Sequence, residues 1–276
     1  MTTLINNVKT AALLGLMFGL ILVLGLAIGG KAGLIIAFGI ALFTNFGAFF
    51  FSDKIALAAM RGQEVNENTP GAGELVQMVH QLADRAALPR PRVYICPQQA
   101  PNAFATGRSP KKAAVAVTQG ALELLTYDEL EGVMAHELAH VKNRDTLTAT
   151  VAATIAGAIS FLAWMSIWDR DAHPLVRIGA FLLAPIAASI VQMAISRSRE
   201  FVADADGAQI AGSPTGLINA LQKLENYSKR IPMQTRPSQN HMFIVQPFSG
   251  AGKSLANLFS THPPTQVRIE KLRKIS

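Results

Sequence analysis

Cysteine and charge are both scarce in this chain. Cys96 is the only cysteine among the 276 residues, so an intrachain disulfide is excluded, which agrees with a reducing compartment. Charged residues make up 16% of the chain, whereas about a quarter is usual for a soluble domain. The low charge predicts segments that lie in a membrane.

Charged residues are almost absent from four long segments. Residues 11–30 and 32–51 contain none, and only Lys31 separates them. Each segment has about 20 residues, enough for a helix to cross the hydrocarbon core of a bilayer. Residues 1–51 are therefore predicted to form a transmembrane hairpin. A cleavable signal peptide is disfavoured because the second apolar segment follows the first without a polar region.

A second hairpin is predicted for residues 147–196. Residues 147–168 are uncharged, and residues 175–196 contain only Arg177, which lies near the start of its segment and can reach the membrane surface. Two buried helices of a soluble core are the alternative, but the length and lack of charge favour membrane spans. The hairpins separate two polar regions, residues 52–146 and 197–276.

The distribution of lysine and arginine predicts the orientation in the membrane. These residues lie mainly in the two polar regions, whereas the turns of the hairpins, at Lys31 and residues 169–171, carry little positive charge. Because positive residues favour the cytoplasmic side, both termini and both polar regions are expected there. The net charge of +7 is attributed to this bias and to attraction to anionic lipid. A nucleic-acid partner is not expected, because there is no basic stripe with interleaved aromatic residues.

The most specific motif is His136-Glu137-Leu138-Ala139-His140. On a helix, two histidines four residues apart lie on one face and can bind one zinc ion, while the adjacent glutamate can take the proton of the attacking water. Residues 126–129 are a capping box that predicts a helix start about two turns earlier. This context disfavours a chance pair of exposed histidines and indicates a hydrolase, above all one that acts on peptide bonds.

The first polar region also predicts a small β-sheet. Residues 70–87 are typical of an amphipathic helix, and residues 92–96, 102–105 and 113–117 are typical of short strands. The predicted fold is therefore mainly α with a small β-sheet. An edge strand of this sheet could bind an extended substrate, or the sheet could be ordinary scaffold; the pattern leaves both open.

A third zinc ligand has to come from another part of the chain. Catalytic zinc usually has three protein ligands, and a histidine six residues after His140 is excluded because Thr146 stands there. Glu200 is the best candidate, with Asp204 four residues later to accept a hydrogen bond from a ligand histidine. The alternative is a helix near the membrane with ordinary charges.

Four segments in order resemble one family. They are residues 102–107 (NAFATG), 136–145 (HELAHVKNRD), 199–204 (REFVAD) and 261–265 (THPPT). Together with the apolar hairpins they resemble the HtpX family of bacterial inner-membrane zinc metalloproteases, relatives of the CAAX prenyl proteases. The resemblance implies a zincin-like (gluzincin) catalytic domain fused to four transmembrane helices.

The resemblance also implies roles for particular residues. One zinc ion would be bound by His136, His140 and Glu200, with Glu137 as general base. Asn102 and His262 are candidates to stabilise the substrate oxyanion, although His262 could equally be a helix-entry residue before two prolines.

The function implied by the resemblance is cleavage of misfolded or damaged membrane proteins at the cytoplasmic side of the inner membrane, in quality control and stress response. The expected partners are polypeptide substrates and the lipid bilayer. Whether the protein forms a homo-oligomer is left open by the sequence. The alternative functions are a non-catalytic membrane scaffold, which the presence of Glu137 and a third ligand disfavours, and a transporter.

Overall fold

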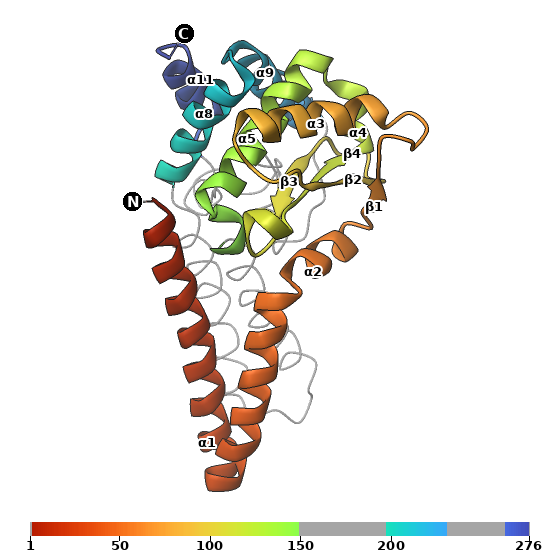
Figure 1. Cartoon of the computed structure of the whole chain (residues 1–276). Coiled ribbons are helices and arrows are strands. Elements are labelled where there is room, and N and C mark those ends of the chain that lie inside the picture. Colours follow the sequence, from red (N-terminus) through yellow and green to blue (C-terminus); the bar gives the residue numbers. More distant parts are fainter. Residues whose placement is uncertain (1, 149–196, 231–262, 276) are drawn as a thin grey trace.

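The computed structural model describes residues 2–148, 197–230 and 263–275. These residues form a long helical hairpin that projects from a body of helices around a small sheet (Figure 1). His262 and nearly all of the predicted second hairpin, residues 149–196, lie outside the described residues.

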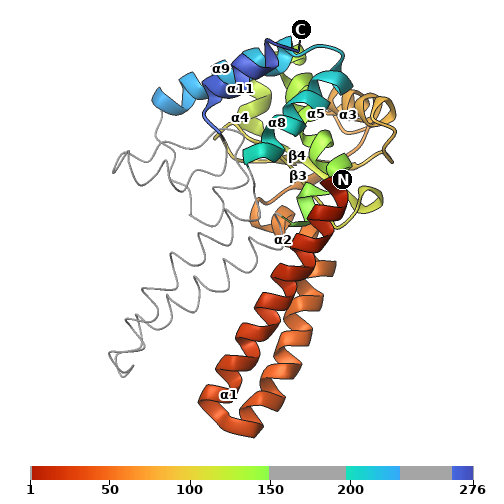
Figure 2. The same cartoon turned by 90° about the vertical axis from the view of Figure 1, so that its left-hand side faces the viewer.

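The hairpin is formed by α1 (Thr2–Phe50), which reverses direction at Gly30. Gly30 has φ 56° and ψ −140°, a conformation that glycine adopts without the steric penalty of a β-carbon. The two arms lie side by side in both views (Figures 1 and 2). The predicted turn next to Lys31 is thus confirmed.

Among the described residues, no helix is both long enough and apolar enough to cross a membrane, so the predicted spans 11–30 and 32–51 are not confirmed. The arms nevertheless expose many large apolar side chains. These are Leu4, Ile5, Val8, Leu16, Val23, Leu26, Ile35, Ile36, Phe38, Ile40, Leu42, Phe43, Phe46 and Phe50.

The sheet has four strands in the order β1-β2-β4-β3. They are β1 (Gln63–Val65), β2 (Arg92–Cys96), β3 (Ala103–Thr106) and β4 (Ala114–Thr118). β2 and β4 are parallel, while β1 pairs with β2 and β3 pairs with β4 in antiparallel fashion. The three predicted strands are confirmed to within one residue. β1 was not predicted, because three residues carry too little alternation to reveal a strand.

Each face of the sheet packs on a different layer. Val93, Val115 and Val117 belong to the main core, together with α3 (Gly73–Arg85) and α5 (Tyr127–Asn143). Tyr94 and Cys96 point to the other face and pack with α2 (Ser52–Ala59). This alternation is the two-residue period of a strand that is buried on both faces.

The remaining described elements complete the body. They are a 3₁₀ helix, η1 (Pro110–Lys112), and the helices α4 (Gln119–Leu124), α8 (Arg197–Ala211), α9 (Thr215–Arg230) and α11 (Thr265–Leu272). α5 lies at the centre, in contact with α3, α8, α9 and β3. The fold is mainly helical with a small mixed sheet, as predicted.

The start of the predicted second hairpin lies beside the first. Residues 145–148 are helical, and the hydroxyls of Thr10 and Thr148 share a buried hydrogen bond of 2.9 Å. The chain therefore leaves the body next to the first arm of α1.

Candidate active site

Helix α5 positions the two histidines of the central motif. Its first turn is held by a capping box, in which Thr126 Oγ1 accepts from the backbone of Glu129 and Glu129 Oε2 accepts from the backbone of Thr126. The helix ends at Arg144, which has left-handed geometry (φ 59°). The predicted capping box is confirmed, and the motif lies in the middle of a helix that is capped at both ends.

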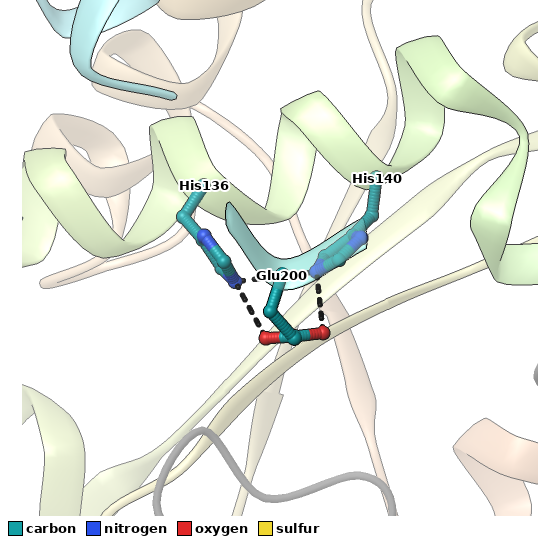
Figure 3. A group of neighbouring side chains, drawn as sticks. All are labelled: His136, His140 and Glu200. Atoms are coloured by element: carbon teal, nitrogen blue, oxygen red, sulfur yellow. Dashed lines mark hydrogen bonds and ion pairs between the residues drawn. The ribbon is translucent and has the colours of Figure 1, made fainter. Parts of the chain in front are cut away.

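His136, His140 and Glu200 converge on one point (Figure 3). Glu200 Oε2 lies 3.7 Å from His136 Nε2, and Glu200 Oε1 lies 3.5 Å from His140 Nε2. The two Nε2 atoms are 3.2 Å apart, and one ligand atom from each residue falls within 4.8 Å of the others. His136 and Glu200 are each 2% exposed. Two imidazoles and one carboxylate are the donor set of a catalytic zinc site that leaves a position open for water.

Helix α8 reaches this point because it packs unusually close to α5. A β-carbon added at Gly207 would lie 2.9 Å from the Cα of His136, closer than such atoms pack. Glycine at this position therefore allows the two backbones to approach, and Glu200, two turns earlier on α8, reaches the histidines of α5.

Asp204 and Arg268 support the first histidine. Asp204 Oδ1 lies 3.1 Å from His136 Nδ1, and both Asp204 oxygens accept from Arg268, at 2.7 and 2.9 Å. Burial alone would raise the pKa of Asp204, but Arg268, with a further contribution from His136, lowers it to about 2. Asp204 is therefore an anion that can hold Nδ1 protonated and leave Nε2 for a metal.

Arg268, from α11, was not identified from the sequence. It is 1% exposed, with Nη1 3.8 Å from Glu200 Oε2 and Nη2 3.4 Å from His136 Nε2. The available signal was weak: Arg268 is four residues before the buried Leu272, so it stands in the apolar stripe of a short helix. A buried cation there offsets the carboxylates of the site.

Asp145 supports the second histidine and was also missed as a functional residue. Its Oδ2 lies 3.1 Å from His140 Nδ1, and its Oδ1 accepts from Arg199 at 3.3 Å. Burial alone would lower the pKa of His140, but Asp145, with Glu200 and Glu137 nearby, raises it to about 9. The carboxylates therefore make this cluster strongly attractive to a cation.

Glu137 lies between the histidine cluster and the sheet. Its Oε2 accepts a hydrogen bond of 2.9 Å from the backbone N–H of Ala105 in β3, and the residue is 7% exposed. β3 is the last strand in the sheet order. The carboxylate is therefore held at the outer edge of the sheet.

The two oxyanion candidates are placed differently. Asn102 is fully buried immediately before β3, where its backbone N–H donates to Thr118 Oγ1 at 2.8 Å. His262 lies outside the described residues. Their roles toward a substrate carbonyl stay predictions.

A helix with paired histidines, a glutamate from a second helix and a neighbouring carboxylate form the arrangement that is typical of a metallopeptidase site. Comparison with known proteins agrees. Residues 71–276 match the model of peptidase family M48. The chain is 54% identical over 280 residues to a protease HtpX homolog of Desulfatibacillum aliphaticivorans, covering 97% of this chain and 89% of that protein.

Other relatives and a solved structure extend this result. A protease HtpX homolog of Pyrococcus furiosus is 50% identical over 281 residues, covering 98% of this chain and 96% of that protein. The crystal structure of S. mikatae Ste24p has a TM-score of 0.53 at 16% identity, which shows a shared fold over 99% of this chain and 66% of that one. The chain therefore belongs to peptidase family M48, among the HtpX proteases, and it is a metallopeptidase.

Proposed function

We propose that this metallopeptidase is a membrane-integrated zinc endopeptidase. Its substrates would be misfolded or damaged membrane proteins, cleaved at the cytoplasmic side of a bacterial inner membrane. The observation that carries the proposal is the buried convergence of His136, His140 and Glu200 with Glu137 beside them at the sheet edge.

Zinc is the metal that this donor set fits best. His136 and His140 would each bind through Nε2 and Glu200 through its carboxylate, while Asp204 and Asp145 hold the Nδ1 atoms. Bound there, one zinc ion would lower the pKa of a water molecule and polarise the scissile carbonyl.

Glu137 is proposed as the general base and later the general acid. Its carboxylate would take a proton from the attacking water and deliver it to the leaving amine. The hydrogen bond from Ala105 N–H to Oε2 orients the carboxylate, and Oε1 would take the proton of the water. Asn102 and His262 are proposed to donate to the developing oxyanion.

The outer edge of β3 is proposed to bind the substrate. In the described part of the chain no strand pairs with this edge, so an extended peptide could add there by backbone hydrogen bonds. A peptide along β3 would pass Glu137, because Glu137 is already bonded to the backbone of this strand. Recognition through the backbone suits a protease that accepts many unfolded sequences.

Membrane integration is supported by the apolar surface of α1. A soluble monomer rarely exposes a contiguous apolar patch larger than a few hundred Å², yet large apolar side chains are exposed along both arms. Lipid would cover these side chains favourably. The second hairpin, residues 147–196, is proposed from its uncharged sequence and from the position of Thr148 beside Thr10. The positive residues support a cytoplasmic active site.

The proposal is tested with Glu137→Gln in full-length protein purified in detergent. Glutamine can still accept from Ala105 N–H but cannot take a proton, so zinc content should be kept while casein cleavage falls by about 10²–10⁴-fold or more. Zinc is measured by elemental analysis, and chelator should abolish wild-type cleavage. Cleavage of a misfolded membrane protein in the same assay tests the substrate class.

Glu131→Gln is the matched control, since Glu131 lies on the same helix and faces Arg85 instead of the zinc ligands. It should cleave at the wild-type rate. Normal cleavage by Glu137→Gln would refute the assigned role, and wild-type protein that cleaves casein equally well after zinc removal would refute the proposed chemistry.

A further inference from the structure

A cationic cavity lies where the second arm of α1 meets the body. Its volume is about 540 Å³, within the range of small-molecule sites. Its lining includes six cations, namely Lys54, Arg90, Arg92, Arg108, Lys111 and Lys112, and one carboxylate, Asp53. None of these residues takes part in the proposed catalytic site.

Most of this positive charge is not neutralised by the residues that the structure describes. Arg92 pairs with Asp53 at 2.7 Å, and Arg90 pairs with Asp84 at 2.9 Å. Within the described ranges, the other four cations (Lys54, Arg108, Lys111 and Lys112) have no acidic partner. Arg108 instead donates to the backbone carbonyl of Phe50 at 2.9 Å. The cavity therefore carries a surplus of positive charge that fits an anion.

The segment that carries Lys111 and Lys112 is held in place by contacts of the Gly107 backbone. Gly107 has φ +127°, and a β-carbon there would lie 2.4 Å from the Lys112 carbonyl oxygen. The Gly107 carbonyl also accepts from Thr146 Oγ1 at 3.0 Å. Lys111 and Lys112, the last two residues of η1, thus belong to a segment that packs tightly against Gly107.

The other wall of the cavity is aromatic and continues into the exposed apolar surface of α1. The rings of Phe46 and Phe50 stack at 4.3 Å, and Arg108 lies over Phe50 at 4.8 Å. Phe51, with Lys54 5.6 Å from its ring centroid, also lines the cavity. Cations therefore adjoin the body, while exposed apolar side chains continue along α1.

We propose that this cavity binds the headgroup of an anionic phospholipid. The phosphate would lie among Lys54, Arg108, Lys111 and Lys112, since arginine and lysine are the side chains that bind phosphate. The acyl chains would lie along Phe46 and the exposed apolar side chains of α1. A soluble anion would contact only the cations, whereas a phospholipid has both a charged headgroup for the cations and acyl chains for the apolar side chains. The inference rests on the proposed membrane integration, and it does not depend on proteolysis.

The test measures lipid binding to Glu137→Gln protein, which should not digest itself. Delipidated protein in neutral detergent is titrated with phosphatidylglycerol or phosphatidylcholine of the same acyl chains, and bound lipid is counted by native mass spectrometry. Phosphatidylglycerol should bind more tightly. Lys111→Gln/Lys112→Gln should weaken its binding by roughly 30-fold at low salt, given about a fivefold contribution from each lysine near an anionic headgroup.

Arg85→Gln/Lys274→Gln is the matched control, because it removes the same charge from exposed positions that do not line the cavity. This pair should leave phosphatidylglycerol binding within about twofold of the parent. Equal binding of the two lipids, or an equal loss in the control pair, would overturn the proposal. Displacement of the lipid by an equal concentration of inorganic phosphate would show a simple anion site and would also overturn it. A failure of proteolysis in the earlier assay leaves this measurement unaffected.

Discussion

Replacing Arg268 with methionine tests whether the buried charges of the active site are balanced by this one side chain. Arg268 is 1% exposed and makes two hydrogen bonds to Asp204, while it also lies 3.8 Å from Glu200. Methionine keeps much of the apolar volume but removes the charge and the donors. Asp204 and Glu200 would then be buried carboxylates without their guanidinium.

The expected cost is large because a buried ion pair would be broken from one side only. Removing one partner of such a pair typically costs about 3–5 kcal/mol in the free energy of unfolding. For a domain of this size, each kcal/mol lowers the melting temperature by about 2–4 °C, so a fall of roughly 6–20 °C is expected. Zinc affinity should fall too, because Asp204 would no longer be held beside His136.

Thermal unfolding of the Glu137→Gln protein, with and without Arg268→Met, measures this cost. Arg85→Met is the control for loss of an arginine from an exposed pair, since Arg85 bonds Glu131 at 3.1 Å on the surface. Exposed pairs contribute about 0–1 kcal/mol, so the control should melt within a few degrees of the parent.

A double variant separates pairing from general damage. Adding Asp204→Asn to Arg268→Met removes the uncompensated charge, so the double variant should be more stable than the sum of the single losses by about 0.5–3 kcal/mol. Purely additive losses, or an Arg268→Met variant as stable as Arg85→Met, would refute the charge-balance explanation.

Three further predictions concern the zinc ligand, the helix contact and the buried thiol. Glu200→Gln should lower zinc content sharply, because an amide is a poorer ligand than a carboxylate; full occupancy by elemental analysis would exclude the ligand role. Gly207→Ala should cost about 1–3 kcal/mol and reduce zinc content, because the new β-carbon would push α8 away from α5. Gly39→Ala, which has no atom within 4 Å of the added β-carbon, is the control, and equal melting temperatures for the two variants would contradict the reasoning. Burial raises the pKa of Cys96 from 9.0 to about 11. As pH rises between these values, the thiol ionises in the unfolded chain but not in the folded one, so the free energy of unfolding should fall. Iodoacetamide at pH ~9 should accordingly label Cys96 only after unfolding, and rapid labelling of the native protein would be evidence against a buried thiol.

The sequence predicts those local structures whose geometry depends on neighbouring residues. The spacing of His136 and His140, the capping box at Thr126, and the strands at residues 92–96 and 113–117 all follow from helix or strand periods. Strand β1 was not predicted, because it has only three residues. The predicted membrane spans rest on composition, which indicates the environment of a helix rather than its contacts, and they are not confirmed for the described residues.

Much of the chemistry of this protein can be predicted from neighbouring residues alone: a helix with two imidazoles and a carboxylate, a candidate third ligand, and an apolar hairpin that turns beside Lys31. The surroundings of these groups depend on how distant parts of the chain pack together. Arg268 meets His136 across 132 positions of the chain, Ala105 N–H orients Glu137, and the cations beside Phe50 come from separate segments. Such contacts depend on how helices and strands pack, and the periodicity of the sequence does not indicate which distant residues will be in contact.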